Sequence, residues 1–119
     1  MAVAGTIDFT QFRAEDSGET KRYRYGMYTG PKFYSNFYTS GGTGDPIIPG
    51  DLKLGQLHVL LFETAVNAAG VPLAPMYVQG QPGGPVGGAI IWMQWGTNAE
   101  VANGTDLSGY SAFFEAVGL

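Results

Sequence analysis

Apolar and polar positions alternate along the most aromatic stretch of the chain, residues 21–38. In its first half, "KRYRYGMY", Tyr23 and Tyr25 alternate with Arg22 and Arg24. A period of two residues places these two sets on opposite faces of a β-strand. The turn residues "TGP" separate this run from a second alternating run, "KFYSNFYT". We therefore predict two strands joined by a turn, and the first strand has one apolar face and one basic face.

The same reading predicts short strands along the rest of the chain. They are expected at 6–12, 57–66, 72–80, 89–97 and 110–119. The strand "LHVLLFETAV" is apolar on both faces, which is typical of a buried strand. Pro75 interrupts the next one and indicates an edge strand or a bulge. With seven to eight short strands and no helix longer than one turn, the expected fold is all-β, an antiparallel β-sandwich of jelly-roll type.

The stretches between the strands are rich in turn residues. "RAEDSGETK" is expected to form a charged turn, and residues 40–56 an extended loop. Within that loop "PGDLKL" fits one helical turn, with Asp51 able to cap its N-terminus. "NGT" at 103–105 also fits the glycosylation pattern, but a turn is the simpler interpretation.

The length of 119 residues corresponds to one domain. Gly and Pro make up 19 + 7 = 26 residues, which suits many tight turns, and the abundant aromatic residues indicate a folded chain. We expect residues 6–119 to form a single sandwich domain. Residues 1–5, "MAVAG", are small and apolar and are expected to form an arm that orders on a neighbouring molecule.

The composition indicates where the protein is made and what kind of surface it has. The chain has no Cys, so disulfides and thiolate metal sites are excluded. The first residues lack the pattern of a signal peptide, and the apolar run "AIIWM" is too short to span a bilayer, so we expect a protein made in the cytoplasm with no membrane partner. All six Lys and Arg lie in residues 1–53, and residues 54–119 carry only acidic charges. Charged residues are only 13% of the chain, which is typical of a surface covered by neighbours.

The sequence offers few groups for catalysis. His58 is the only His and lies in the most apolar strand, where a structural role is the simpler interpretation. Glu63 and Glu115 lie on predicted strands and could meet, as a glycosidase would require. The glycine-rich stretches "GGTG" and "GGPVGG" lack the Lys-Ser or Lys-Thr of a phosphate loop. We therefore predict no enzyme activity, no cofactor, and no catalytic, cofactor-binding or metal-binding residues.

Binding of single-stranded nucleic acid is the main alternative for the aromatic stretch, because such platforms combine aromatic and basic side chains. They place both kinds of residue on one face, however, and here alternation separates Tyr23 and Tyr25 from Arg22 and Arg24. The net charge of −4 also differs from that of a typical nucleic-acid binder. We therefore expect no nucleic-acid partner.

Binding through a protein surface remains, since Tyr, Trp, Phe, Met and Arg are enriched at protein interfaces. Trp92 and Trp95 point to opposite faces of their strand, so at least one of them is expected in the core. The residues predicted to lie at interfaces are Val3, Arg22, Arg24, Tyr28, Tyr34, Tyr38 and Trp92.

Two stretches carry a resemblance to a known class of protein. "FYTSGGTGDPIIPGDLKLGQLHVLLFE" and "EVANGTDLSGYSAFFEAVG" resemble small virion structural proteins of tailed bacteriophages. The shared features are a Gly pair, a turn containing "PGDLKL", an apolar strand, and a final strand that follows a "GTDLS" turn. Together the two stretches cover less than half of the chain.

This resemblance implies a capsid decoration or cement protein, a compact β domain on the exterior of the virion. Its expected partners are the major capsid protein and other copies of itself, in a homodimer or homotrimer, after synthesis in the host cytoplasm. Such a protein stabilises the assembled shell because it binds the shell better than unassembled subunits. The alternatives are a phage tail or baseplate component and a carbohydrate-binding β-sandwich module.

Overall fold

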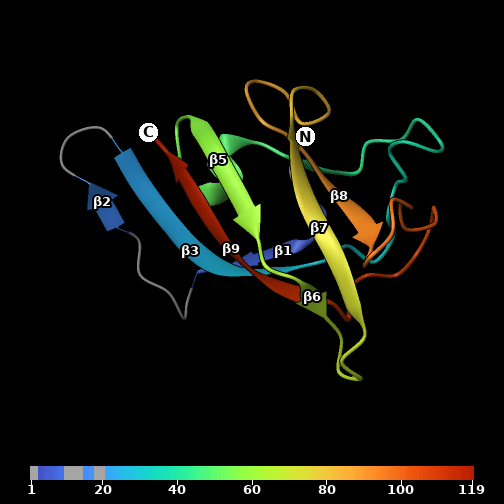
Figure 1. Ribbon diagram of the computed structural model, residues 1–119. Helices are drawn as coiled ribbons and strands as arrows, with labels where there is room; N and C mark the ends of the chain where they lie inside the picture. Colours follow the sequence, from blue (N-terminus) through green and yellow to red (C-terminus); the bar gives the residue numbers. More distant parts are fainter. Residues whose placement is uncertain (1–2, 10–14, 18–20) are drawn as a thin grey trace.

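The protein is an all-β, antiparallel structure (Figure 1). A computed structural model describes residues 3–9, 15–17 and 21–119, and for residues 15–17 it describes the backbone only. Over these residues no α-helix occurs, and the single helical element is the 3-10 helix η1 (Pro49–Leu52). The strands are β1 (Thr6–Asp8), β2 (Glu15–Ser17), β3 (Lys21–Thr29), β4 (Asp45–Ile47), β5 (Leu57–Phe62), β6 (Ala65–Val66), β7 (Pro72–Gln79), β8 (Gly88–Gln94) and β9 (Ser111–Gly118).

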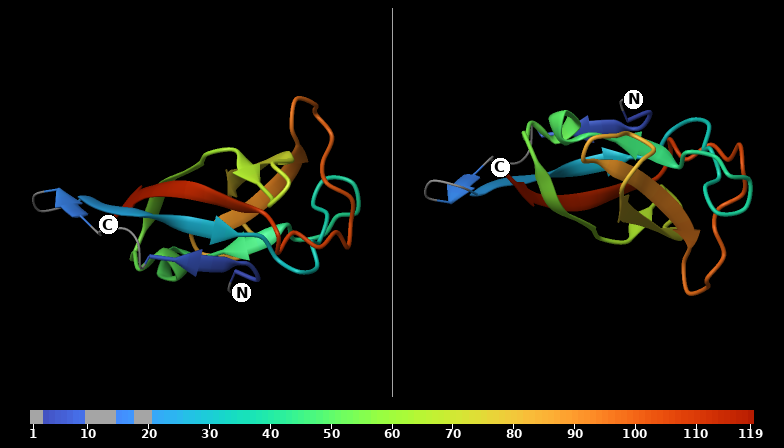
Figure 2. Two further views of the ribbon diagram at one scale, coloured as in Figure 1. Left: turned by 90° about the horizontal axis from the view of Figure 1, so that it is seen from below. Right: turned by 90° about the horizontal axis from the view of Figure 1, so that it is seen from above.

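The strands belong to one curled sheet. Its order is β1-β3-β9-β6-β7-β8-β4, with β2 pairing with β3 and β5 pairing with β9. The sheet curls into a half-barrel, so that β1, β4 and η1 lie across the core from β9, β5 and β7 (Figure 2). A two-sheet sandwich or jelly roll is therefore not confirmed, whereas the all-β antiparallel class is.

The core fills the inside of the half-barrel. Strand β9 shows its pattern, because Ala112, Phe114 and Ala116 are buried while Phe113 and Glu115 between them are exposed. This alternation gives the sheet one inward and one outward face. The inward side chains that are fully buried include Tyr28, Leu52, Ile47, Ile90 and Trp92.

Strand β3 turns the opposite way from the prediction. The side that the sequence marks as basic faces the core, with Arg24 and Tyr28 buried, while Tyr23 and Tyr25 are only partly buried on the outward side. Alternation alone could not choose the face, since both sides of the strand carry aromatic residues. Gly26 decides the packing locally, because it leaves room for the Phe114 ring on the inward side.

The prediction of a second strand in this region, at "KFYSNFYT", is wrong, because residues 31–44 are irregular. Their backbone hydrogen bonds go to a loop and to side chains in place of a strand ladder. Tyr34 N–H donates to the Thr105 carbonyl at 3.1 Å. The Phe37 and Tyr38 N–H groups donate to the Glu100 carboxylate at 2.6 and 2.7 Å. Side-chain partners of this kind compete with regular secondary structure.

Residues 3–5 of the predicted arm lie against the chain's own domain. The Ala4 and Gly5 N–H groups donate to the Asp45 carboxylate at 2.6 and 3.0 Å, and the Val3 N–H donates to Asp51 at 3.2 Å. Val3 also packs against the core. The expectation that the arm orders on a neighbouring molecule therefore does not hold for residues 3–5. Met1 and Ala2 lie outside the described residues.

The turns follow the sequence more closely. The predicted helical turn forms as η1, and Asp51 accepts the Ile48 N–H at 3.0 Å, which satisfies one free backbone donor at its start. A turn also forms at "NGT". Asp45–Ile47 was expected in a loop and instead forms β4, which pairs with β8. Glu15–Ser17, expected within a charged turn, pairs with β3 as β2.

Candidate functional site

Three of the predicted interface residues belong to the core. Tyr28, Tyr34 and Trp92 are 0% exposed, so they have no surface for a partner in this fold, and the prediction is corrected for them. Their aromatic character is explained by core packing and by the polar atoms that they bring to it. The expectation that at least one of the two Trp residues lies in the core is confirmed, because Trp92 is buried, while Trp95 is exposed.

These buried side chains form a continuous chain of hydrogen bonds. Tyr28 donates its hydroxyl to Asp45 at 2.5 Å and accepts the indole N–H of Trp92 at 3.2 Å. Tyr34 accepts the backbone N–H of Trp92 at 3.0 Å and donates to Glu100 at 2.6 Å. Each buried polar atom of this chain thus has a partner, as folded proteins require. The chain ties the N-terminal segment, β3, β4, β8 and the irregular segment together.

Burial governs the ionisation of this network. Removal from water is the largest cause that raises the pKa of Tyr28, of Tyr34 and of Asp45, because burial disfavours the charged form. The hydrogen bonds that Asp45 accepts from Tyr28, Ala4 and Gly5 act in the opposite direction on its pKa but do not reverse the shift. The two tyrosines therefore stay neutral at physiological pH and serve as fixed hydrogen-bonding groups.

The remaining predicted interface residues are placed differently. Arg24 is buried, and its guanidinium donates to the Lys53 carbonyl at 3.1 Å, so it is corrected to a structural residue. Arg22 and Tyr38 are exposed. Val3 is half-buried against the core. For Arg22, Tyr38 and Val3 an interface role stays a prediction.

The outward side chains of three neighbouring strands form rows across the sheet. In one row Tyr23 of β3 is opposite Val117 of β9, which is opposite Val59 of β5. The next row consists of Tyr25, Glu115 and Leu61. In a third row Met27 is opposite Phe113, whose carbonyl accepts the Glu63 N–H at 2.9 Å. We call these positions the outer face; they are Tyr23, Tyr25, Met27, Val59, Leu61, Glu63, Phe113, Glu115 and Val117.

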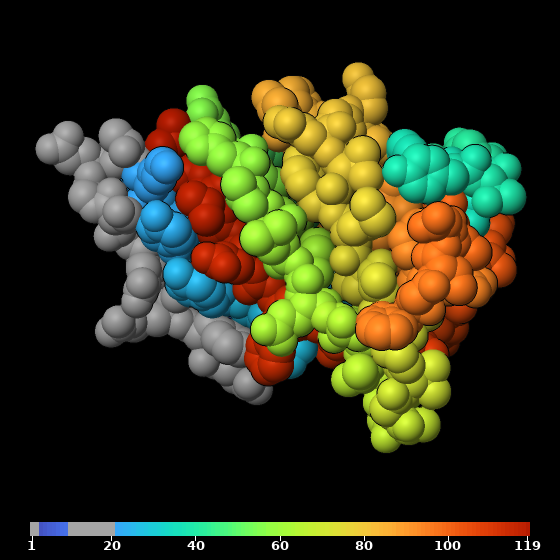
Figure 3. Space-filling view, in the orientation of Figure 1, coloured from blue at the N-terminus to red at the C-terminus, as the bar shows by residue number. Residues whose placement is uncertain are grey.

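The outer face is apolar apart from its two glutamates, and it is open to solvent. Leu61 is 59% exposed, Phe113 45% and Val59 42%. In the space-filling view β3, β9 and β5 lie side by side on the surface that faces the viewer (Figure 3). The largest contiguous apolar patch on the surface of a monomeric protein is often functional.

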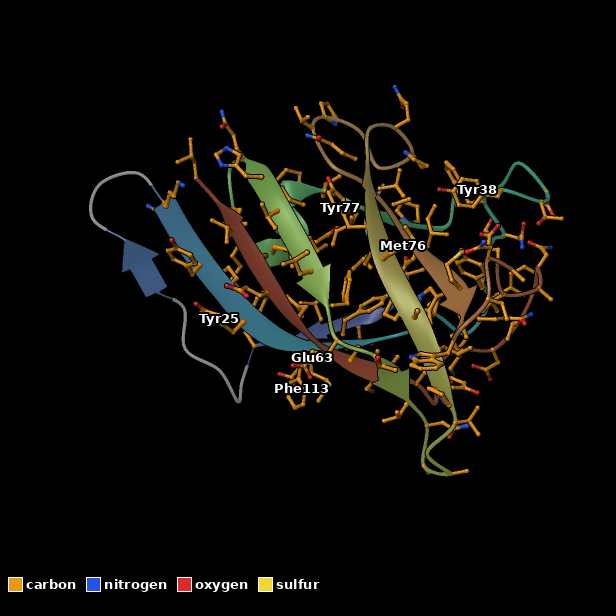
Figure 4. All side chains as sticks on the ribbon, in the orientation of Figure 1. Tyr25, Tyr38, Glu63, Met76, Tyr77 and Phe113 are labelled. Atoms are coloured by element: carbon orange, nitrogen blue, oxygen red, sulfur yellow. The ribbon has the colours of Figure 1, made fainter. Side chains whose placement is uncertain are left out.

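A hollow of about 350 Å³ lies in this face, and we call it the outer groove. Its lining comes from the same strands: Tyr25, Gly26, Leu61, Phe62, Glu63, Phe113, Phe114 and Glu115. In Figure 4 Glu63 and Phe113 lie close together near the end of β5, and Tyr25 lies on β3 to their left. The described lining residues include two carboxylates and no basic side chain.

The sequence singled out Glu63 and Glu115 as carboxylates that could meet, and both line the outer groove. His58 is exposed, with its Nε2 3.4 Å from the Gln56 side-chain oxygen, and does not join them in the groove lining.

Among the described residues there is no group of three or more His, Cys, Asp and Glu arranged to hold a metal ion. None of the helical segments that the structure describes has the length and apolarity needed to cross a membrane.

Sequence reasoning missed Tyr25, Leu61 and Phe113 as surface residues of the site. Leu61 belongs to the stretch that is apolar on both faces, which was interpreted as a fully buried strand. This pattern carried the signal for an exposed apolar surface. A small chain buries a smaller share of its surface, so a strand that is apolar on both faces can leave one apolar face uncovered.

No protein family, no curated protein and no solved structure matches the chain. The resemblance of residues 37–63 and 100–118 to phage virion proteins therefore stays a prediction. The structure does bring these two stretches together, since β5 and β9 pair along their length and form much of the outer face.

Proposed function

We propose that the protein is a non-enzymatic structural protein of a phage virion, a decoration protein that binds the exterior of the assembled capsid through its outer face. The observation that carries this proposal is the open apolar surface of β3, β9 and β5. Phe113 is exposed beside the partly buried Tyr23 and Tyr25, and aromatic residues are enriched in protein interfaces.

The physical logic of decoration suits a surface of modest size. A protein that binds the assembled shell and not its free subunits stabilises the shell by mass action. Many copies acting on one shell make a modest affinity at each site sufficient. The sequence stretches that resemble virion proteins contribute β5 and β9 to this face, which is a second line of support.

The proposal is tested by co-sedimentation with empty shells assembled from the major capsid protein of the same virus. We expect the wild-type protein to sediment with shells and not with unassembled capsid subunits. Leu61→Ser should weaken binding by about tenfold or more, because it removes an apolar side chain that the contact would bury. Val86→Ser is the matched control, since Val86 and Leu61 are both 59% exposed and Val86 lies outside the outer groove.

Two outcomes would contradict the proposal. Wild-type protein that stays in the supernatant with shells and sediments with purified tails would indicate a tail or baseplate component. Equal shell binding by Leu61→Ser and Val86→Ser would place the contact elsewhere on the molecule. For the glycan-binding alternative the substitutions must be made at the exposed Tyr38 and Trp95, because Tyr34 and Trp92 are buried.

A further inference from the structure

We propose that the outer groove receives a Lys or Arg side chain, carried by an apolar segment of the partner protein. This inference rests on the proposed function, because it names the chemistry of the partner at the same face. Its basis is the combination of a hollow, two carboxylates and two aromatic rings in one small area of the sheet.

The carboxylates are placed to flank a cation. Glu115 stands between Tyr25 and Leu61 in its row, and Glu63 stands beside Phe113 in the next row. Both line the same hollow. The two glutamates occupy diagonal positions on adjacent strands, where neighbours are roughly 7–8 Å apart and their Cβ atoms somewhat closer, so a long side chain can still reach both. Docking would shield this pair of charges from water and so strengthen their attraction to a cation.

The rest of the lining suits the stem of the same side chain. The aliphatic part of Lys or Arg packs along apolar surface while its charged end reaches a polar site. Tyr25 and Phe113 line the same hollow, and aromatic rings attract cations. A contact of this kind occurs elsewhere in the protein, since the Lys53 ammonium lies 5.0 Å from the centre of the Phe9 ring.

The described residues that line the groove include no Lys or Arg, and β5 and β9 come from residues 54–119, which contain none. The described lining is therefore electrostatically one-sided, and its complement is a basic side chain. The same two carboxylates would repel the phosphates of a nucleic acid.

A second copy of the chain fits this face poorly. Two outer faces packed on each other about a two-fold axis would gather four glutamates in one interface. The rows span roughly 300 Å² from standard strand spacings. That is well below the ~800 Å² that each partner contributes to a standard interface. The area matches one docked segment, so copies of this chain that associate would use another surface.

The direct test is an NMR titration of the full-length protein with two short peptides. The peptides are acetyl-Leu-Arg-Leu-amide and acetyl-Leu-Glu-Leu-amide. We expect the Arg peptide to shift the amide signals of Leu61, Glu63 and Glu115, and the Glu peptide to leave them unchanged. In E63Q/E115Q the affinity for the Arg peptide should fall about tenfold, because two charged acceptors are lost. Equal shifts with both peptides, or an unchanged affinity in the double variant, would overturn the proposal.

A charge-restored variant separates the local effect from that of net charge. E63Q/E115Q/Q81E/Q94E has the net charge of the wild type, with the acids moved to exposed positions outside the groove. We expect it to bind the Arg peptide as weakly as E63Q/E115Q does. Recovery of wild-type affinity would mean that only the net charge matters.

The shell assay distinguishes failure of this inference from failure of the proposed function. If the wild type binds shells and E63Q/E115Q binds them equally well, the decoration role stands and the cation pocket does not. If the wild type does not bind shells, the decoration role fails, and the peptide titration still decides on the pocket. Sedimentation velocity checks the second copy as occupant: a dimer that E63Q/E115Q strengthens would overturn the assignment of the groove to a basic partner.

Discussion

Gly26 lies at the point where β1, β3 and β9 come closest together. A Cβ at this position would lie 2.5 Å from the Asp8 carbonyl oxygen and 2.7 Å from the Phe114 ring. We expect Gly26→Ala to lower the free energy of unfolding by about 1–3 kcal/mol, as overpacked core positions do. Gly109→Ala is the control, because no atom lies within 4 Å of the added carbon. Urea denaturation measures both, and equal stabilities would show that the three strands can separate without cost.

Asp45 makes the stability depend on pH in a defined direction. Burial raises the pKa of this carboxyl in the folded state, so the folded protein holds its proton more tightly than the unfolded chain does. The contribution of Asp45 to stability is therefore largest below its ordinary pKa and declines as pH rises through the folded-state value.

Asp45→Asn tests this sign. We expect the free energy of unfolding of the wild type, minus that of the variant, to decrease as pH rises from 3 to 7 in urea titrations. The Asn side chain does not titrate, and the other groups are shared by both proteins. A difference that grows with pH would mean that the bonds from Ala4, Gly5 and Tyr28 stabilise the carboxylate more than burial disfavours it.

Among the elements, the irregular segment at residues 31–44 is joined to β8 by the Tyr34 hydroxyl, in addition to its other hydrogen bonds. Tyr34→Phe would leave the buried Trp92 N–H without its acceptor and Glu100 without one donor. We expect a loss of about 1–3 kcal/mol in the free energy of unfolding, the cost of an unsatisfied buried polar group. Tyr38→Phe, at an exposed position, should change it little. Equal effects in thermal unfolding would show that the hydroxyl network does not hold this segment.

The strands illustrate what the sequence could and could not predict. The predicted strands at 57–66, 72–80, 89–97 and 110–119 follow from apolar runs bounded by turn residues, and each range contains a strand of the structure. The strand expected in "KFYSNFYT" failed because its backbone partners are the Glu100 carboxylate and a distant loop, which no local pattern reveals. Which face of β3 turns inward depends on Asp45 and Phe114, both far away in the sequence.

At the scale of the whole molecule, the curl of the sheet explains why one apolar face stays open. A single curled sheet can enclose only its inner side, so, within the described residues, no second sheet packs against the outward residues of β3, β9 and β5. Of the candidate site, the sequence singled out Glu63 and Glu115, but as a catalytic pair and without their aromatic neighbours.

Because the outer face is open to solvent, a substitution on it should affect partner binding and leave the stability of the fold almost unchanged. Leu61→Ser should change the free energy of unfolding by no more than about 0.5 kcal/mol, since Leu61 is 59% exposed. Calorimetry of the variant checks this. A large loss of stability would show that the outer face supports the fold, and the binding assays at this position would then report unfolding.

The central claim is that the outer face is the surface that meets the partner. A cryo-electron microscopy reconstruction of decorated shells tests it most directly. The account predicts that β3, β9 and β5 face the capsid, with a Lys or Arg of the major capsid protein between Glu63 and Glu115. Ordered density in which β1, η1 and β4 meet the shell and the outer groove faces solvent would contradict it.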